Sequence, residues 1–430
     1  MPHLSRSLLL ALLALLVTLL VVNLIGGGCR GTQSANTGLD DAAPQDAAHL
    51  APTVILISLD GFRPDYVDRY EAPTLRRLAA EGVRAEGMMP SFPSKTFPNH
   101  YTVVTGLYPE NHGIVANTMY DPEFDASFSM GNREAVRDGR WWGGEPIWVT
   151  LEQQGQKSAP FFWPGSEAEI KGTRPSYWLP FDNSMAAEAR IDKVMAWLAL
   201  PAAERPTFIT LYFSNVDSQG HRHGPGSAEA AQAVRDVDGY LASLVGRLEA
   251  AGLYNAVNLI IVADHGMVAS SSERVVFLDD YIDMDDVRVV DYDPVAMIRP
   301  KAGKLEAVYA ALKEAPHVSF YKKAEIPEAL HFRAHRRMPA LVGVADEGWR
   351  ITTRSFYNRN PSRFDGGTHG YDHRLPSMSA LFIARGPAFT EGKTVGPFAN
   401  IHVYNLMTTI LGVEPAPNDG DFEAVRHLLR

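Results

Sequence analysis

Six side chains of the kinds that bind divalent metals recur along the chain: Asp60, Asp217, His221, Asp264, His265 and His369. Alone, each has an ordinary explanation, because an aspartate that follows a strand is most often a turn or helix-cap residue. As a set, these carboxylates and imidazoles, all expected in loops, offer the oxygen and nitrogen ligands that suit Zn²⁺. Six ligands are enough for two ions that keep open coordination positions, as catalytic zinc requires. The set therefore predicts a catalytic site with two zinc ions.

The spacing of these residues also favours two ions. Asp217 and His221 are four residues apart in an expected glycine-containing turn, so both side chains can face one ion. Asp264 and His265 are adjacent and point in different directions, which fits the bridging of two metals better than the chelation of one.

A nucleophile is expected at Thr96, which opens a helical stretch that continues through Thr105. Backbone N–H groups and the helix dipole favour an anion at a helix N-terminus. A threonine hydroxyl is a poor nucleophile until it loses its proton, and coordination to a metal is one way to achieve this. The alternative is that Thr96 only caps the helix.

Three short, continuously apolar runs lead to the aspartates, at residues 54–59, 207–213 and 258–263. Such runs are typical of buried strands in a parallel sheet. Amphipathic helical stretches fall at residues 72–81, 185–198 and 228–251. Strands that alternate with helices predict an α/β fold with a mostly parallel central sheet and helices on both faces. Because ligands bind outside the carboxyl ends of such strands, the three aspartates are expected in one site.

The folded body is expected over residues 52–430, with a smaller inserted or capping subdomain over residues 267–365. That segment has its own strand signals at residues 287–290 and 297–299, a helical stretch at 304–315 and a charged, strand-like region at 318–323.

Residues 1–28 are interpreted as an export signal peptide or a membrane anchor, because residues 8–25 form an apolar run. Cys29 follows three glycines, as at a bacterial lipoprotein processing site, although Gly26 departs from the larger aliphatic residue usual there. A lipid on Cys29, a cleaved signal and an uncleaved anchor remain open. Each of the three alternatives predicts a periplasmic or cell-surface protein. Residues 29–51 are expected to form a flexible tether between this N-terminal segment and the folded body.

The composition narrows the class of protein. Of 430 residues, 46% are hydrophobic and 21% charged, which excludes a mainly disordered, collagen-like or multi-span membrane chain. A single cysteine excludes an intramolecular disulfide framework and a multi-cysteine metal site. The net charge of −10 offers no basic footprint for duplex nucleic acid, whereas a small phosphate-bearing substrate is compatible with bound metal ions.

Several motifs, in order, resemble the nucleotide pyrophosphatase/phosphodiesterase family of the alkaline phosphatase superfamily. They are VILISLDGFR at residues 54–63, PSFPSKTFPNHY at 90–101, TGLYPENHG at 105–113, FWPGS at 162–166, ADHGM at 263–267 and GTHG at 367–370. The likeness extends over residues 53–415 and is specific, because the order and spacing of the motifs span a whole catalytic domain. It implies an alkaline-phosphatase-like fold and a two-zinc phosphodiesterase.

Carried onto the matching positions, the resemblance also assigns roles to residues. It implies that Asp217, His221 and His369 hold one zinc and that Asp60, Thr96, Asp264 and His265 hold the other. It implies that Thr96 attacks phosphorus in line and forms a phospho-threonine ester, which is then hydrolysed. Asn117 matches the family asparagine that donates a hydrogen bond to a non-bridging phosphate oxygen.

A nucleotide is the expected substrate, and a nucleoside 5′-monophosphate the expected product. Phe97, beside the nucleophile, and Tyr212, at the end of its strand, are expected to stack on the base, with Tyr177 and Trp178 as weaker candidates. Core packing is the alternative for each of these aromatic residues. The summed charge of two zinc ions, three carboxylates and an alkoxide is near zero, which favours a monoanionic diester over a dianionic monoester.

Two other functions use the same metal site. They are hydrolysis of a lysophospholipid or choline ester, for which an aromatic cage binds the cation, and hydrolysis of a phosphonate or sulfate ester. A non-catalytic surface binding protein is disfavoured by the presence of all seven expected metal-site residues.

Overall fold

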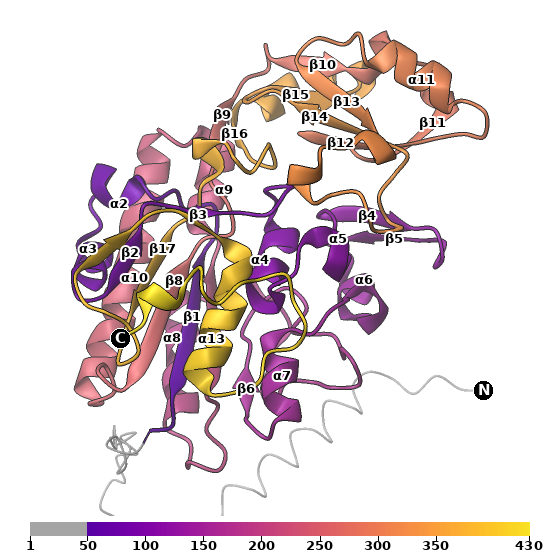
Figure 1. Cartoon of the computed structure of the whole chain (residues 1–430). Helices are drawn as coiled ribbons and strands as arrows, with labels where there is room; N and C mark the ends of the chain where they lie inside the picture. The colour runs from indigo at the N-terminus through magenta and orange to yellow at the C-terminus, as the bar shows by residue number, and fades with distance from the viewer. Residues whose placement is uncertain (1–49) are drawn as a thin grey trace, which may run out of the picture. The chain divides into compact units, whose positions relative to one another are not determined.

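The computed structural model describes residues 50–430, which are built around a seven-stranded sheet (Figure 1). In the spatial order β18-β2-β17-β8-β1-β7-β6, the strands are Lys393–Val395, Val83–Ala85, Phe382–Arg385, Val257–Val262, Thr53–Leu59, Phe208–Phe213 and Ser158–Ala159. Neighbouring strands are parallel except at β17, which is antiparallel to both β8 and β2. The expected mostly parallel sheet is confirmed.

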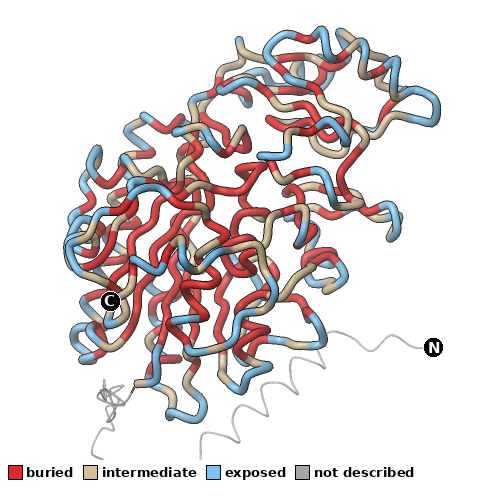
Figure 2. Tube along the Cα trace, in the orientation of Figure 1, coloured by how far each residue is buried: buried red, intermediate tan, exposed pale blue. Residues whose placement is uncertain are grey.

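The central strands are continuously apolar because both faces of the sheet are covered. All residues of β1 and β8 are buried (Figure 2), as is typical of parallel strands between two helical layers. In the register of the sheet, Ser58 on β1 lies opposite Tyr212 on β7 and Val262 on β8. The carboxyl ends of these three strands therefore coincide, and the residues that follow them meet at one edge.

Helices cover both faces of the sheet, as predicted (Figure 1). On one face, α10 (Ala228–Ala250) packs with α3 (Pro73–Ala80) and α8 (Ala187–Leu198). On the other face, α13 (Val403–Leu411) packs against β1 and against α4 (Thr96–Thr105). The predicted bounds of α3, α8 and α10 differ from the observed ones by two residues at most.

Shorter elements complete the body of the protein. The helices are α2 (Tyr66–Arg69), α5 (Pro109–His112), α6 (Arg133–Arg137), α7 (Ile147–Gln153) and α9 (Asn215–His223). Two strand pairs lie outside the central sheet, β3 with β19 (Met88–Met89, Phe398–Ala399) and β4 with β5 (Thr118–Asp121, Ala126–Ser129).

Residues 267–365, hereafter the insertion, contain a separate four-stranded antiparallel sheet. In the order β11-β12-β14-β13, its strands are Val287–Asp291, Val295–Pro300, Leu341–Ala345 and Val318–Lys322. Helix α11 (Leu305–Leu312) packs on this sheet and contributes to a second hydrophobic cluster with Ile298 and Leu341. The insertion also contains β10 (Val275–Phe277), β15 (Arg350–Thr352) and α12 (Arg354–Tyr357).

The chain leaves and re-enters the body along neighbouring strands. β9 (Val268–Ser270) and β16 (Gly366–Thr368) pair antiparallel at the two ends of the insertion. The residue that follows β16, His369, is thereby placed beside the body.

The predicted signal or anchor and nearly all of the predicted tether lie outside the described residues. Among residues 50–430, no helix combines the length and the apolar character that crossing a membrane requires.

Candidate active site

The structure brings the expected metal-binding residues together at the carboxyl edge of the central sheet. Asp60 follows β1, and Asp264 and His265 follow β8. Their side-chain atoms form three groups, each with ligand atoms within 4.8 Å of one another: Asp217 with His221 and His369, Asp60 with Asp217 and His265, and Asp60 with His100 and Asp264.

Asp217 and His221 lie on helix α9, so the expected glycine-containing turn is wrong. Residues four apart share one face of a helix, and His221 Nε2 lies 3.3 Å from Asp217 Oδ1. The helix was missed because Asn215, Ser218 and Gly220 have low helix propensity. The two side chains nevertheless face one point, as the spacing of four residues predicted.

His369 approaches the same carboxylate from the end of β16, with its Nε2 atom 3.8 Å from Asp217 Oδ1. Two glycines allow this approach. A Cβ atom on Gly367 would lie 2.5 Å from the carbonyl oxygen of Gly220, and one on Gly366 would lie 2.2 Å from that of His221. β16 therefore packs directly on the backbone of α9.

Three histidines present the Nε2 atom to the site. The Nδ1 atoms of His221, His265 and His369 lie 2.9, 2.8 and 2.8 Å from backbone carbonyl oxygens. Because a carbonyl oxygen only accepts hydrogen bonds, Nδ1 carries the hydrogen of each neutral ring and Nε2 presents a lone pair. Metal-ligating histidines are oriented by their second nitrogen in this way.

Buried carboxylate oxygens face these lone pairs. Asp60 Oδ1, Asp217 Oδ1 and Asp264 Oδ2 are buried without a hydrogen bond from another group among residues 50–430. Asp264 Oδ2 lies 2.9 Å and Asp60 Oδ1 3.5 Å from His265 Nε2. Burial of unpaired anionic oxygens is costly unless a cation compensates them. The donor set therefore fits divalent cations such as zinc.

The pKa values of the buried groups depend on how these carboxylates and histidines face one another. Burial raises the pKa of Asp60 well above its usual value, and the Asp264 and Asp217 carboxylates raise it further. Burial also acts to raise the pKa of Asp264, but the facing His265 and His100 rings outweigh it and hold that pKa well below its usual value. Burial lowers the pKa of His265, but the Asp264 carboxylate outweighs it and raises the pKa to about 9. Without a metal, the site thus depends on a proton for charge compensation.

Thr96 is the first residue of α4, where its Oγ1 atom lies 3.3 Å from His265 Nε2. The next backbone N–H group, that of Phe97, donates a hydrogen bond to Asn117 Oδ1 at 2.9 Å. The Asn117 amide nitrogen is therefore left as a donor beside the helix N-terminus, where the dipole favours an anion.

His100 was not expected to contact the metal-binding residues. Its Nδ1 atom lies 2.9 Å from the Thr96 carbonyl oxygen and 3.3 Å from Asp264 Oδ2, and its Nε2 atom lies 2.8 Å from Ser58 Oγ. The carbonyl contact requires a hydrogen on Nδ1, so His100 bonds to the backbone of α4, faces Asp264 Oδ2 and does not offer that nitrogen to a metal. Its place one helical turn after Thr96 was the signal in the sequence.

An aromatic pocket adjoins Thr96. Phe97 and Tyr212, the two residues expected to stack on a base, line it together with Phe162, Trp163 and Phe181. The Tyr212 hydroxyl also donates a hydrogen bond of 2.6 Å to Asp60 Oδ2. Phe181 was missed, although it is 40% exposed and packs against Phe162 and Tyr212 with ring centroids 5.4 and 6.2 Å apart. A large aromatic residue in a loop, between Pro180 and Asp182, was its only signal.

Tyr177 lies outside the aromatic pocket. Its ring centroid is 6.2 Å from that of Trp197 on α8, and its hydroxyl donates to the Glu204 carbonyl oxygen at 2.9 Å. Trp178 also lies outside, where Arg174 covers its ring at 5.5 Å. The expected contact of Tyr177 with substrate has no support in this geometry, because its ring is used in packing against α8.

Comparison with known proteins places the chain in a family. The model of the type I phosphodiesterase / nucleotide pyrophosphatase family matches residues 54–372. The chain is 41% identical over 395 residues to ectonucleotide pyrophosphatase/phosphodiesterase family member 1 of Mus musculus. The aligned region is 88% of this chain and 43% of that protein. It is also 39% identical over 389 residues to the venom phosphodiesterase CdcPDE of Crotalus durissus collilineatus, and this aligned region is 88% of this chain and 46% of that protein. The chain thus spans less than half the length of these relatives.

The same family appears among solved structures. Murine ectonucleotide pyrophosphatase/phosphodiesterase 5, solved as an inactive variant in complex with AMP, superposes with a TM-score of 0.84 at 38% identity and covers 88% of this chain and 100% of that chain. The alkaline-phosphatase-like α/β fold is thereby confirmed. The chain belongs to the type I phosphodiesterase/nucleotide pyrophosphatase family, as its motifs predicted.

Proposed function

We propose that the protein is a two-zinc phosphodiesterase that hydrolyses nucleotide phosphodiester and pyrophosphate bonds and releases a nucleoside 5′-monophosphate. The observation that carries this proposal is the position of Thr96, whose hydroxyl lies at the N-terminus of α4 beside uncompensated carboxylates and histidine lone pairs. The names of the relatives and the AMP bound to the murine neighbour support a nucleotide substrate.

Two groups of residues would hold the zinc ions. Asp217, His221 and His369 would bind one ion, and Asp60, Thr96, Asp264 and His265 would bind the other. When bound, the ions would lower the pKa of the attacking oxygen and compensate the charge of the phosphate.

The residues of the chain would then carry the reaction in two steps. The Thr96 hydroxyl gives its proton to water, and Thr96 Oγ attacks phosphorus in line. The Oγ–P bond forms while the bond to the leaving oxygen breaks, and its electron pair departs with that oxygen. Asn117 Nδ2 donates a hydrogen bond to a non-bridging oxygen. Water then adds a hydroxyl to phosphorus, and Thr96 regains its hydroxyl hydrogen as the threonine ester breaks.

The aromatic pocket favours a base over a choline cation. Phe97, Phe181 and Tyr212 offer ring faces for stacking, which every base can use. The carboxylate that lines the pocket, Glu167, is paired with both Arg133 and Arg137. Its charge is therefore compensated and does not draw a quaternary ammonium, so we place choline esters second.

The charge beside the nucleophile favours diesters over monoesters. Lys95 precedes Thr96, but its ammonium group is paired with Asp291 at 2.5 Å, so it adds no net charge for a phosphate dianion. We expect a nitrophenyl ester of a nucleoside monophosphate to be hydrolysed with a much higher kcat/KM than the monophosphate itself. Equal values for the two substrates would contradict this preference.

The protein is also proposed to act outside the cytoplasm. The relatives are named as ectoenzymes, and residues 1–28 carry the apolar run of an export signal or anchor. Incorporation of labelled palmitate that Cys29→Ser abolishes would identify a lipid anchor, whereas equal labelling of both forms would exclude Cys29 as its site.

Replacement of the nucleophile tests the proposed mechanism. We expect Thr96→Ala to lower kcat on the nitrophenyl ester by about 10³-fold or more, while the protein retains measurable zinc by elemental analysis. Acid quenching of the wild-type reaction should trap a phosphate ester on Thr96. Thr409→Ala, on the exposed side of α13, is the matched control and should behave as wild type. Unchanged turnover in Thr96→Ala would refute Thr96 as the nucleophile.

A further inference from the structure

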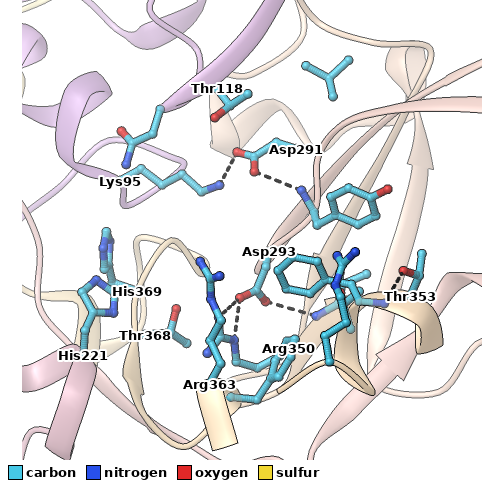
Figure 3. Close-up of a pocket in the computed structure, with 18 of the residues that line it drawn as sticks. Lys95, Thr118, His221, Asp291, Asp293, Arg350, Thr353, Arg363, Thr368 and His369 are labelled. Carbon is cyan, nitrogen blue, oxygen red and sulfur yellow. Dashed lines mark hydrogen bonds and ion pairs between the residues drawn. The ribbon is translucent and has the colours of Figure 1, made fainter. Parts of the chain in front are cut away.

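Two cavities adjoin the metal-binding residues, and their walls are held in different ways. One lies between the active-site histidines and the insertion, where the ion pairs Lys95–Asp291 and Arg350–Asp293, both at 2.5 Å, fix its polar walls (Figure 3). The other is the aromatic pocket beside Thr96. Aromatic rings cannot be fixed to one another by ion pairs, so their positions depend on the residues that lie behind them.

Three walls of the aromatic pocket come from different segments of the chain. Phe162 shortly follows β6, Phe181 lies in the loop before α8, and Tyr212 lies on β7. The Phe181 ring joins the other two, with its centroid 5.4 Å from that of Phe162 and 6.2 Å from that of Tyr212. Because Phe181 is 40% exposed, its position depends on how its loop is attached to the body of the protein.

Arg190, on α8, attaches this loop to β7. The residue is only 5% exposed and lies outside the lining of the aromatic pocket. Its side chain donates hydrogen bonds to the carbonyl oxygens of Tyr212 at 2.6 Å, Met185 at 3.0 Å and Asn183 at 3.3 Å. The first acceptor belongs to β7, and the other two belong to the loop that carries Phe181. One guanidinium group therefore joins the segments of two walls.

The same guanidinium group supports the third wall. It lies 5.2 Å from the centroid of the Phe162 ring, within the distance of about 6 Å at which a cation is attracted to a ring face. Phe162 has a φ of 60°, in the left-handed region that residues other than glycine adopt at a cost. Such a conformation persists only where the surrounding contacts hold it. The contact with Arg190 is one that does so.

Packing alone does not explain an arginine at this position. The other side chains on the buried face of α8 are apolar: Ile191, Val194, Trp197 and Leu198. A charged group on such a face is costly unless its donors are hydrogen-bonded, and apolar residues of similar volume often stabilise a fold as well or better. The three segments that the guanidinium group joins account for its presence.

We propose that Arg190 is a positioning residue, which holds Phe181 against Tyr212, with Phe162 beside them, in the arrangement that binds the base. It acts on the substrate through these rings and does not touch it. This inference rests on the proposed function and adds a residue to its binding machinery. Loss of the guanidinium group therefore weakens binding of the base and leaves the chemistry at Thr96 unchanged.

Two diesters with the same leaving group test this role. The 4-nitrophenyl ester of adenosine 5′-monophosphate carries a base, whereas methyl 4-nitrophenyl phosphate does not. Arg190→Lys keeps the charge and loses the planar fork that reaches several carbonyl groups. With metal-quantified enzyme, we expect this variant to raise KM for the nucleotide ester by about 5- to 50-fold. We expect kcat for that ester, and kcat/KM for the methyl ester, to stay within about 2-fold of wild type.

Two results would overturn the proposal. An equal fall in kcat/KM for both esters would show that Arg190→Lys disturbs the whole active site and not the binding of the base. Unchanged KM for the nucleotide ester would show that the rings keep their places without the guanidinium group.

Arg385→Lys is the matched control. Arg385 is also buried, at 8% exposure, donates to the backbone carbonyl oxygen of Tyr254 and lies 3.6 Å from the centroid of that ring. It lies opposite Leu259, toward the start of β8, whereas Asp264 follows the end of that strand. We expect this variant to be destabilised in urea unfolding but to keep the wild-type KM for both esters. A rise in KM for the nucleotide ester equal to that of Arg190→Lys would contradict a specific role of Arg190.

A double-mutant cycle shows whether Arg190 acts through Phe181. Phe181→Ala removes the ring that the loop presents, so we expect Arg190→Lys to raise KM for the nucleotide ester by a smaller factor in this background than in wild type. The same factor in both backgrounds would show that Arg190 does not act through Phe181 and would overturn the proposal.

A binding measurement separates this inference from the proposed function. If the wild type hydrolyses neither diester, the proposed function fails. Equilibrium binding of AMP to the metal-loaded proteins then decides the role of Arg190. Weaker binding to Arg190→Lys than to both wild type and Arg385→Lys supports the inference, and equal binding to all three rejects it.

Discussion

Tyr212 combines two contacts that the sequence could not show together. Its ring lines the aromatic pocket, and its hydroxyl donates to Asp60 Oδ2 at 2.6 Å. The hydrogen bond leaves Asp60 Oδ1, a buried oxygen without a hydrogen bond, directed at His265. Side chains that orient a ligand in this way raise metal affinity although they do not touch the metal. Under the proposed function, Tyr212 would act on the metal through its hydroxyl and on the base through its ring.

The two roles of Tyr212 are separable by substitution. Tyr212→Phe retains the ring and removes the hydrogen bond, so we expect zinc affinity to fall about 10- to 100-fold. Competition of the metal-free protein with a chromogenic chelator measures this affinity. Tyr177→Phe loses a hydroxyl that is bonded to the Glu204 carbonyl group and should bind zinc as wild type does. Equal affinities of wild type and Tyr212→Phe would show that the hydrogen bond does not orient Asp60.

At the scale of elements, the fit of β16 on α9 determines where His369 lies. Gly366 and Gly367 have no side chains to hold the two elements apart, and a Cβ atom on Gly367 would lie 2.5 Å from the Gly220 carbonyl oxygen. Because that oxygen belongs to the helix backbone, a side chain at residue 367 would displace β16. His369 would then move away from Asp217 and His221.

This fit predicts the selective loss of one metal. We expect Gly367→Ala to retain less zinc after dialysis than wild type, because only the group of Asp217, His221 and His369 is opened. Elemental analysis gives the zinc content. Gly239→Ala is the control: the residue is exposed on α10, no atom lies within 4 Å of its Cβ position, and the change should stabilise the protein by about 0.5–1 kcal/mol. Equal zinc content in both variants would contradict the packing argument.

At the scale of the whole molecule, a buried ion cluster joins the insertion to the body. Asp121, on β4, accepts hydrogen bonds from Arg337 at 2.7 Å and from Arg336 at 3.0 Å. Arg337 also donates to the carbonyl oxygens of Gly113 and Trp141 at 2.6 and 2.7 Å. Both Asp121 and Arg337 are buried. Gly113 precedes Asn117 and Asp121 follows it, so the cluster holds the insertion against both ends of the segment that contains Asn117.

Removal of one partner from this cluster would leave buried charges unpaired. We expect Asp121→Asn to lower the free energy of unfolding by about 3–5 kcal/mol at pH 7. Asp280→Asn removes one partner of an exposed pair with Arg354, and its effect should stay within about 1 kcal/mol. Urea unfolding measures both values, and equal effects of the two substitutions would contradict the role of the cluster.

The stability from Asp121 should also depend on pH. Burial raises the pKa of Asp121, but Arg336 and Arg337 outweigh it and hold the pKa well below its usual value. A depressed carboxyl pKa stabilises the folded state above the unfolded value of about 3.9 and loses this effect as the pH falls further. The difference in the free energy of unfolding between wild type and Asp121→Asn should therefore begin to shrink below about pH 4 and become smaller as the pH falls further.

The sequence by itself predicted the features that depend on local pattern. The apolar runs at β1, β7 and β8 predicted the parallel strands, because strands buried on both faces need continuous apolar side chains. The types and order of Asp60, Thr96 and the other motif residues predicted the family. The helix at Asp217 was not predictable in this way, because Gly220 and Ser218 lower helix propensity and contacts with β16 outweigh it.

The tertiary structure decided which residues from distant segments share a pocket. The contact of His100 with Asp264 and the exposure of Phe181 beside Phe97 depend on distances between segments far apart in the chain. Hydrophobic periodicity and residue type are properties of one segment and specify its own structure. The distances across the active site are set by the packing of the insertion and α9 against the central sheet, which no single segment encodes.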